Sequence, residues 1–453
     1  MRVEPCDDRS LERGVRQLLA DKVSGTQVGL WLLAPEHLRL GTWDLLQAWA
    51  GRPGSHLDPR LALQLVHEAA LCRTGIRRYR SLSQKGFELA NGLPFVATDQ
   101  AIHQMLERHT IAEAQALQVT LGKIRRARGH YQGNLLAIDP HRMRSWSKRQ
   151  MCRQVSLQTP RPVKTSQVFF TLDAETHQPL AFTVGSSART VAQATPELLR
   201  LAADILQPAP GQTLVLADIE HYTADLLAHV AADTPFDLLL PMPNRLERQA
   251  QLRAIPPDQF TRHWAGFATA RLSSPKSTQR PFAFSPHGPR YTQLVQRCGE
   301  CPDNTTLKAF LCTADRDELQ SLTADFPQRW HVEEFFNAYQ ALGWNRAGTL
   351  NLHIRYGAMS LALIAQTALH QTRQRLGDPF LTWDAQHFAD HLLAALDGDI
   401  RVADDTILVT FYNAPNADRL RQHYHGLPRI LRTEGLDPHI PWLYNFQLDF
   451  RFK

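Results

Sequence analysis

Two short apolar runs, each ending in an aspartate, decide the fold of this chain. The first is 134–140 (NLLAIDP) and the second is 211–218 (GQTLVLAD). Short apolar runs that are bounded by turn-forming residues are typical of strands buried in a sheet. We therefore expect two buried strands in one sheet, with Asp139 near the end of one and Asp218 at the end of the other.

The sequence around these runs predicts the rest of a mixed sheet. Further strands are expected at 167–173, 180–184 and 236–240, and a helical spacing of apolar residues appears at 195–206 and 222–232. The resulting order is three strands, a helix, a strand, a helix and a strand. This order is typical of an α/β domain whose mixed sheet is flanked by helices.

Three regions are expected along the 453 residues, since domains average ~150 residues. Residues 1–130 are expected to form a helical N-terminal region, and 131–376 the α/β core. Within the core, 241–306 is proline-rich, polar and too long for a plain loop, so it is expected to be an inserted β-rich subdomain. Residues 307–313 are expected to return to the sheet. Residues 377–453 are expected to supply C-terminal helices and a β-hairpin that turns at Asp404 and Asp405.

The composition bounds the class of protein. Hydrophobic residues make up 43% of the chain and charged residues 21%, which excludes a disordered chain. The N-terminus lacks the basic and apolar segments of a secretory signal. The uncharged stretch 356–372 falls just short of a membrane span and contains polar residues, which favours a buried helix. Because the chain has only six cysteines, we expect a cytoplasmic protein that is not built on disulfides.

The net charge of +6 is concentrated in one segment. Between 121 and 164 the chain has eleven basic residues and one acidic residue, Asp139, which gives +10 there and leaves −4 for the remainder. A second basic cluster contains Arg73, Arg77, Arg78, Arg80 and Lys85 with no acid among them. Such blocks suit contact with a phosphate backbone, although a solvated basic face is an equally common reading of an isolated cluster.

Asp139 and Asp218 are candidate metal ligands. A carboxylate at the end of a buried strand needs a compensating charge, and a divalent cation commonly supplies it. Carboxylates without histidine or cysteine suit Mg²⁺, which prefers oxygen ligands. The alternative is that each aspartate caps a following helix. Asp173 ends another expected strand, but it starts a turn-forming sequence and is therefore expected at the surface.

A third carboxylate comes from the segment 326–346 (FPQRWHVEEFFNAYQALGWNR), where a helix is expected to begin near Pro327. Glu333 and Glu334 are adjacent, so only one can face a given target in a helix. Glu333 borders the apolar stripe and is the better candidate, whereas Glu334 turns further outward. The alternative is that Glu333 simply pairs with Arg329 one turn earlier on a solvated surface.

Taken together, three motifs resemble the DDE transposases of bacterial insertion sequences, in the retroviral-integrase and RNase H-like superfamily. They are LLAIDPHRMRS around Asp139, LVLADIEHYTADLL around Asp218, and the segment around Glu333. The last is similar to the family signature Tyr-x2-Arg-x3-Glu-x6-Lys, with Arg329 and Glu333 matching. Phe326 replaces the tyrosine and Gln340 replaces the lysine. The similarity covers about 131–375, and the insert resembles the β-rich insert of one branch of the family.

The resemblance implies an RNase H-like catalytic core that binds two Mg²⁺ or Mn²⁺ ions through Asp139, Asp218 and Glu333. It implies metal-dependent cleavage at transposon ends, followed by strand transfer into target DNA by a homodimer whose N-terminal region binds DNA or dimerises. Two alternatives remain: an RNase H-like nuclease that joins no strands, and a domesticated DNA-binding protein without activity. The residues expected to contact DNA are Arg329, Gln340, Arg142, Arg144, Lys148, Arg149, Arg153, Arg77, Arg78 and Arg80.

Other motifs favour no further chemistry. Cys298 and Cys301 form a CxxC pair, but no second pair follows at zinc-ribbon spacing, and Cys312 and His287 are the nearest residues that complete a site. Free thiols in a turn between two inserted strands are the preferred reading. The sequence 183–187 (TVGSS) lacks the lysine and the spacing of a phosphate-binding loop.

Overall fold

The computed structural model describes residues 7–453, apart from 26, 54, 74–81, 83–84, 146–147, 157–158, 265–274, 299–304 and 346–348, although 82 is described. The chain divides into two compact units. The central unit is Arg125–Phe335, and the terminal unit combines Met1–Ile124 with Phe336–Lys453. The sequence led us to expect separate regions at 1–130 and 377–453, with 336–376 in the core. In the structure, Met1–Ile124 and Phe336–Lys453 instead form one unit, the terminal unit.

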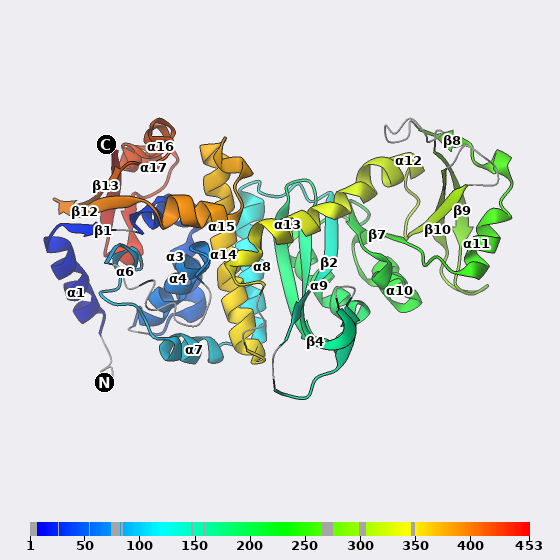
Figure 1. Ribbon diagram of the computed structural model, residues 1–453, viewed down its shortest axis with the longest axis horizontal. Helices are drawn as coiled ribbons and strands as arrows, with labels where there is room; N and C mark the ends of the chain where they lie inside the picture. Colours follow the sequence, from blue (N-terminus) through cyan, green and yellow to red (C-terminus); the bar gives the residue numbers. More distant parts are fainter. Residues whose placement is uncertain are drawn as a thin grey trace. The chain divides into compact units, whose positions relative to one another are not determined.

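The central unit contains a mixed sheet that includes five strands in the order β5-β4-β2-β6-β7. Figure 1 labels β2, β4 and β7 among them. These strands are β2 (Leu135–Arg144), β4 (Thr159–Asp173), β5 (Gln178–Ser186), β6 (Thr213–Leu216) and β7 (Phe236–Pro241). β2, β4 and β5 pair antiparallel, while β2, β6 and β7 pair parallel. Each of the five expected strands is therefore confirmed.

β2 is longer than the sequence indicates, because it continues through Pro140 to Arg144. Its pairing with β6 spans only Leu135 to Ala137, whereas its pairing with β4 continues to Arg144. Beyond Ala137 the strand therefore has one described neighbour. A proline is tolerated on such an edge because its missing N–H leaves no ladder bond unmade on the open side.

Helices α9 (Val191–Leu206) and α10 (Ala224–Asp233) lie close to the predicted ranges. α9 begins with a capping box in which Thr190 and Gln193 satisfy each other's backbone N–H groups, and its apolar face packs on β4 and β5. Thr223 caps α10 by accepting a hydrogen bond from the Leu226 N–H. Both helices are buried along one face, which closes that part of the sheet.

The insert extends the same sheet instead of forming a separate one. After α11 (Leu246–Arg253), the turn η3 (Pro257–Gln259) and the short β8 (Arg262–His263), strands β9 (Lys276–Phe282), β10 (Tyr291–Cys298) and β11 (Thr306–Cys312) follow. They pair antiparallel, and β11 pairs with β7 through Leu311 and Leu240, which confirms the expected return to the sheet (Figure 1). The short hairpin strand β3 (Arg153–Ser156) pairs with the first half of β4 at the other edge.

The segment expected to hold a helix from Pro327 is helical from Glu318 to Leu342, with changing pitch. It comprises α12 (Glu318–Gln320), the π-turn η5 (Ser321–Asp325), the 3₁₀ turn η6 (Phe326–Trp330), α13 (His331–Tyr339) and η7 (Gln340–Leu342). Pro327 lies in the first positions of η6, where its missing N–H costs no hydrogen bond. The central unit ends within α13, after Phe335.

The terminal unit is helical, with one five-stranded mixed sheet in the order β1-β12-β13-β15-β14. Its strands are β1 (Val23–Gly25), β12 (Asp397–Ala403), β13 (Thr406–Tyr412), β14 (His439–Ile440) and β15 (Phe446–Phe452). β12 and β13 form the expected hairpin, which closes with Ala403 opposite Thr406. Its helices and helical turns are α1 (Asp8–Ala20), η1 (Val28–Leu33), α2 (Ala34–Leu40), α3 (Thr42–Ala50), α4 (Leu57–Ala70), α6 (Lys85–Ala90), α7 (Asp99–Glu107), α8 (Ile111–Ala127, which crosses the unit boundary), α14 (Leu352–Leu376), η8 (Phe380–Thr382), α15 (Ala385–Phe388), η9 (Ala389–Leu393), α16 (Ala417–Tyr424), α17 (Leu427–Thr433) and η10 (Pro441–Leu443).

The long helix α14 contains the uncharged stretch noted in the sequence. It packs on α4 and α7 and is buried over most of its length, which confirms the expectation of a buried helix. Within the part of the chain that the structure describes, no helix is both long and apolar enough to cross a bilayer.

Asp173 is a correction to the sequence interpretation, because its side chain is fully buried. It accepts hydrogen bonds from the backbone N–H groups of Gln132, Gly133, Glu175 and Thr176 at 2.8–3.1 Å. Two of these donors belong to the turn that Asp173 starts, and two belong to the approach to β2. The carboxylate therefore joins two loops and is no surface residue.

Candidate active site

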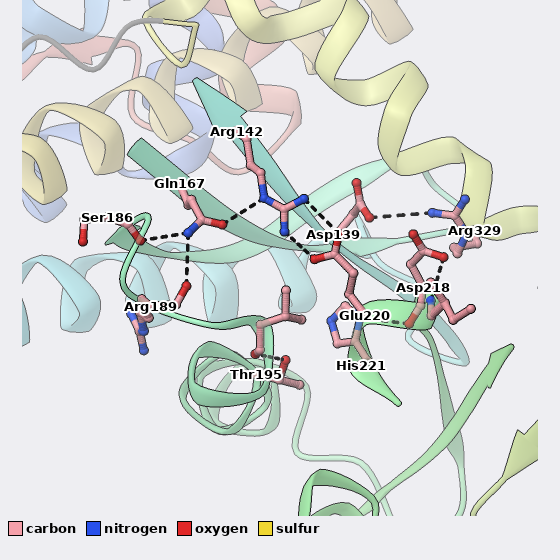
Figure 2. Close-up of polar contacts among 12 residues, drawn as sticks. Asp139, Arg142, Gln167, Ser186, Arg189, Thr195, Asp218, Glu220, His221 and Arg329 are labelled. Carbon is pink, nitrogen blue, oxygen red and sulfur yellow. Dashed lines mark hydrogen bonds and ion pairs between the residues drawn. The ribbon is translucent and has the colours of Figure 1, made fainter. Parts of the chain in front are cut away.

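The strand register brings Asp139 and Asp218 to the same edge of the sheet. Ala137 on β2 lies opposite Leu216 on β6 in the parallel ladder. Each aspartate follows two residues later, where side chains return to the same face of a strand. Asp218 keeps an extended backbone (φ −85°, ψ 170°) just beyond β6. Figure 2 shows both side chains on the side of Arg329.

Glu333 and Arg329 reach this edge from the helical segment 318–342. The Arg329 guanidinium lies 3.7 Å from Asp139 Oδ1 through Nη1 and 3.4 Å from Glu333 Oε1 through Nη2. The arginine therefore stands between two of the three expected ligands. Glu334, the adjacent acid, is 54% exposed and points toward His331 instead. The structure thus places Glu333, and not Glu334, beside the strand-end aspartates.

Asp139 is the electrostatically strained member of the group. Burial raises its pKa to about 7, and the neighbouring carboxylates of Asp218 and Glu333 add to the rise while Arg329 opposes it. Within the described part of the chain, no N–H group donates a hydrogen bond to this carboxylate. Its negative charge is therefore poorly compensated by the protein alone.

The donor set fits a divalent cation that prefers oxygen. Asp139, Asp218 and Glu333 offer only carboxylate oxygens, which suit Mg²⁺ or Mn²⁺. The carboxylates are not drawn together as tightly as ligands in a closed site. The one group of three acidic, histidine or cysteine side chains within 4.8 Å of one another, among the described residues, lies elsewhere. A cation at this edge would supply the positive charge that Asp139 lacks.

The loop after Asp218 adds two polar residues, Glu220 and His221, to the site. Asp218 Oδ1 accepts a hydrogen bond from the Ile219 N–H at 2.7 Å and so begins the 3₁₀ turn η2 (Ile219–His221). The His221 ring donates from Nδ1 to the Asp218 carbonyl at 3.2 Å, and burial lowers its pKa to about 4, so the ring stays neutral. This contact fixes the backbone at Asp218.

Glu220 binds Arg142 through two hydrogen bonds, one of them from Nη1 to Oε1 at 2.9 Å (Figure 2). The pKa of Glu220 falls because Arg142 donates to the carboxylate. Arg142 also donates from Nε to Gln167 Oε1 at 3.1 Å, and the Gln167 amide in turn donates to the carbonyls of Ser186 and Arg189. A polar chain thus joins the strand ends of β2, β4 and β5 to η2.

The other expected DNA contacts differ in their placement. Arg144, Lys148, Arg149 and Arg153 are all exposed along the end of β2 and the start of β3. Arg161, on the paired stretch of β4, is exposed as well. Arg125, counted in the same basic block, is instead buried and donates to the Pro179 carbonyl and to Gln178. The basic block therefore contains both an exposed hairpin extension and a structural arginine.

The second basic cluster lies largely outside the described residues, since Arg77, Arg78 and Arg80 are among those omitted. Its two described members at the ends are engaged with carboxylates. Arg73 contacts Asp390 at 3.2 Å, and Lys85 contacts Glu88 at 2.6 Å. These two side chains serve ion pairs within the terminal unit.

The two positions that depart from the transposase signature lie in different units. Phe326 packs edge-to-face against Phe310 of β11, with ring centroids 4.8 Å apart. The phenylalanine therefore joins the core at the start of η6. Gln340 follows α13 and belongs to the terminal unit.

Cys312, one of the proposed partners of Cys298, does not lie beside it. Cys301 lies outside the described residues, and Cys312 is at the opposite end of the β10–β11 pair, because Cys298 faces Thr306 while Cys312 faces Thr292. Six residues along a strand separate these positions by ~20 Å. Cys312 therefore cannot complete a metal site with Cys298.

The sequence interpretation missed Glu220, His221 and Gln167. Glu220 carried a weak signal, since it is an acidic residue that follows Asp218 by two positions. Gln167 gave none, because only the β4–β5 register brings it to Arg142.

No protein-family model matches the chain, and no curated protein matches it either. Among solved structures, the chain is similar to a piggyBac transposase in a synaptic complex with hairpin DNA. The two share 12% sequence identity and align with a TM-score of 0.36 over 83% of this chain and 82% of the other. A similarity at this level does not establish a common fold.

Proposed function

We propose that this protein is a DNA transposase that cleaves at transposon ends and transfers the strand into target DNA. The observation that carries the proposal is the meeting of Asp139, Asp218 and Glu333 at one edge of the sheet. Asp139 lies on β2, Asp218 follows the neighbouring parallel strand β6, and Glu333 comes from a helical segment packed beside them. The strand order, with three antiparallel strands followed by two parallel ones, supports an RNase H-like core.

The surroundings of the triad support DNA as the substrate. Arg144, Lys148, Arg149 and Arg153 follow Asp139 along β2 and β3 and expose their side chains. Neutralising several backbone phosphates is what gives nucleic-acid binding most of its affinity. The basic extension begins on the strand that holds Asp139, so it leads bound DNA toward the triad.

In this mechanism Asp139, Asp218 and Glu333 would hold two Mg²⁺ or Mn²⁺ ions. When bound, such ions polarise the scissile phosphate and activate the attacking oxygen. Arg329 holds Asp139 and Glu333 in place and offsets part of their charge, while His221 fixes the backbone at Asp218. The exposed arginines bind phosphates on either side of the cut. Water attacks first and releases a 3′-OH, which then attacks the target strand in a second phosphoryl transfer.

A strand-joining assay tests the proposal. The full-length protein is incubated with Mg²⁺, labelled DNA from the regions that flank its gene, and a supercoiled target plasmid. We expect cleavage followed by label joined to the plasmid, and Asp218→Asn should abolish both. Cleavage without a joined product identifies a nuclease of the same fold instead. If DNA binding persists in wild-type protein without cleavage, the inert DNA-binding alternative holds.

The matched control is Asp225→Asn, an exposed aspartate in the first turn of α10. It makes the same change of charge seven positions beyond Asp218, and we expect it to leave cleavage unchanged. A homodimer that acts in trans and a cytoplasmic location belong to the same proposal. Light scattering of the protein with and without DNA tests the dimer.

A further inference from the structure

A second cluster of potential metal-binding side chains lies beyond the end of β4, where the chain turns into β5. His177 is in the turn between β4 and β5, while His331 and Glu334 are three positions apart in the first turn of α13. All three belong to the central unit. Among the described residues, this is the one group of three potential ligands whose donor atoms all lie within 4.8 Å of one another.

The donor atoms of the three side chains lie almost as close together as the ligand atoms around a bound metal ion. The rings of His177 and His331 have centroids 3.8 Å apart and planes inclined by 42°, and Nε2 of His331 lies 4.0 Å from Glu334 Oε2. Tetrahedral zinc with bonds of ~2.0–2.1 Å holds its ligand atoms ~3.4 Å apart. The cluster needs to contract by only about 1 Å to meet this. His177 and Glu334 are exposed, so their side chains are able to rotate inward.

The tautomer of His331 is already the one that a metal requires. Its Nδ1 lies 2.8 Å from the carbonyl oxygen of Ala174, which only accepts hydrogen bonds, so Nδ1 carries the proton. In the neutral ring this leaves the lone pair on Nε2, the atom that faces Glu334. A histidine ligand whose second nitrogen donates to a backbone carbonyl is the usual arrangement around protein-bound metals, because it fixes the ring.

Hydrogen bonds hold the backbone of the turn that carries His177. Asp173 accepts hydrogen bonds from the N–H groups of Glu175 and Thr176, and His177 adopts a left-handed conformation (φ +57°). The same turn supplies the Ala174 carbonyl that orients His331. One loop therefore positions the first ligand and selects the tautomer of the second.

We propose that His177, His331 and Glu334 bind a Zn²⁺ ion, with water in the fourth position. Two imidazoles and one carboxylate suit zinc, whereas the oxygen-only triad suits Mg²⁺. The ion ties the β4–β5 turn to the first turn of α13, which also carries Glu333. Its role is to hold that helical turn in place beside the triad. The site stands independently of the proposed DNA chemistry, because it uses none of the triad residues.

Metal titration of the full-length protein tests the site. After removal of bound metal with a chelator, the protein is titrated with Co²⁺ and then with Zn²⁺. We expect the visible d–d absorption of tetrahedral Co²⁺ without thiolate charge-transfer bands, and its loss when one equivalent of Zn²⁺ is added. His177→Asn should weaken Zn²⁺ binding at least ~100-fold. Asparagine tolerates the left-handed backbone at this position, so the variant is expected to fold.

Controls separate this site from the others. Asp218→Asn should leave the Co²⁺ spectrum unchanged, because it alters only the triad. His229→Asn removes a histidine from an ordinary pair with Asp233 at 2.9 Å on α10, and it too should leave binding unchanged. Glu334→Gln should weaken binding as His177→Asn does. The proposal is overturned if wild-type protein shows no tetrahedral Co²⁺ spectrum, or if His177→Asn binds Zn²⁺ with unchanged affinity.

Discussion

Two aspartates of the β2–β4 strand pair, three pairs apart in the ladder, are in opposite circumstances. Asp173 ends β4 and accepts four backbone hydrogen bonds at 2.8–3.1 Å. Asp139, on β2 opposite Phe170, is contacted by Arg329 at 3.7 Å, and its pKa is raised to about 7 by burial. One carboxylate is part of the scaffold, and the other is a charge that the scaffold does not satisfy.

The difference shows why burial alone does not identify a catalytic acid. A buried carboxylate is stable when enough N–H groups donate to it, and it is destabilising when they do not. Destabilisation is tolerated where a ligand supplies the missing charge, so Asp139 is the functional candidate and Asp173 the structural one. Changing Asp139 or Asp173 to asparagine tests this contrast, because the chemical change is the same at both positions.

The largest expected effect is on activity at Asp139. Asp139→Asn removes one anionic ligand of the proposed metal site and should lower the rate of DNA cleavage at least ~1000-fold, since the ions carry most of the transition-state stabilisation. Single-turnover cleavage of labelled DNA at saturating Mg²⁺ measures the loss. Retention of wild-type rates by this variant would remove Asp139 from the mechanism and with it the contrast to Asp173.

Asp173→Asn should have its effect on stability. The amide nitrogen that replaces one oxygen cannot accept hydrogen bonds, so two N–H groups lose their acceptor, at a cost of roughly 1–3 kcal/mol in the free energy of unfolding. Urea denaturation measures this loss. Cleavage by the folded fraction, assayed at low temperature, should remain. An unchanged midpoint of unfolding would show that the four hydrogen bonds contribute little.

The stability effect of Asp139→Asn should have the opposite sign. The pKa of the wild-type Asp139 carboxyl is about 7 in the folded protein and lower in the unfolded chain. At pH values between these two pKa values, the folded state therefore binds more protons than the unfolded state. Stability of the wild type therefore falls as pH rises to about 7 and then levels off. Without metal, Asp139→Asn should be more stable than wild type by on the order of 3 kcal/mol at pH ~8, and equal to it near pH ~4.

Denaturation in a chelator at several pH values tests this prediction. Saturating Mg²⁺ should reduce or reverse the difference, because the ion stabilises only the protein that retains the carboxylate. A variant that is less stable than wild type at every pH would mean that Asp139 is satisfied in the folded protein.

The contrast also marks what the sequence was able to predict. The runs that hold Asp139 and Asp218 are continuous apolar strands, and local pattern was enough to find them. Asp218 follows β6 as expected, whereas β2 continues past Asp139 to Arg144. The burial of Asp173 was not predictable, because two of its four donors are about 40 positions earlier in the chain. A turn does follow Asp173, as the sequence indicates. However, Gln132 and Gly133, which lead into β2, also donate to the Asp173 carboxylate.

The same reason explains the other differences. His331 is oriented by a carbonyl 157 positions away, and Arg142 by Glu220 at a distance of 78 positions. Neither pairing leaves a periodic or short-range signal. The changes in helical pitch before α13 were also invisible, since apolar spacing does not distinguish one tight turn from the next. The positions of the strands along the chain were predictable from local pattern, whereas the side-chain partners depend on how the sheet packs.

The smallest expected effect concerns Arg142, which lies on the same strand as Asp139 and is held by Glu220. Both side chains are more than a third exposed, so their ion pair should contribute less than ~1 kcal/mol to folding.

Glu220→Gln removes the carboxylate and leaves Arg142 available to a DNA phosphate. We expect DNA affinity to rise a few-fold at low salt, and the slope of log K against log salt to steepen by up to ~0.9. Fluorescence anisotropy across a salt series measures both, with Asp204→Asn, which breaks an exposed pair on α9, as the matched control. Equal slopes for the two variants would show that Arg142 contacts no phosphate and serves only the polar chain to Gln167.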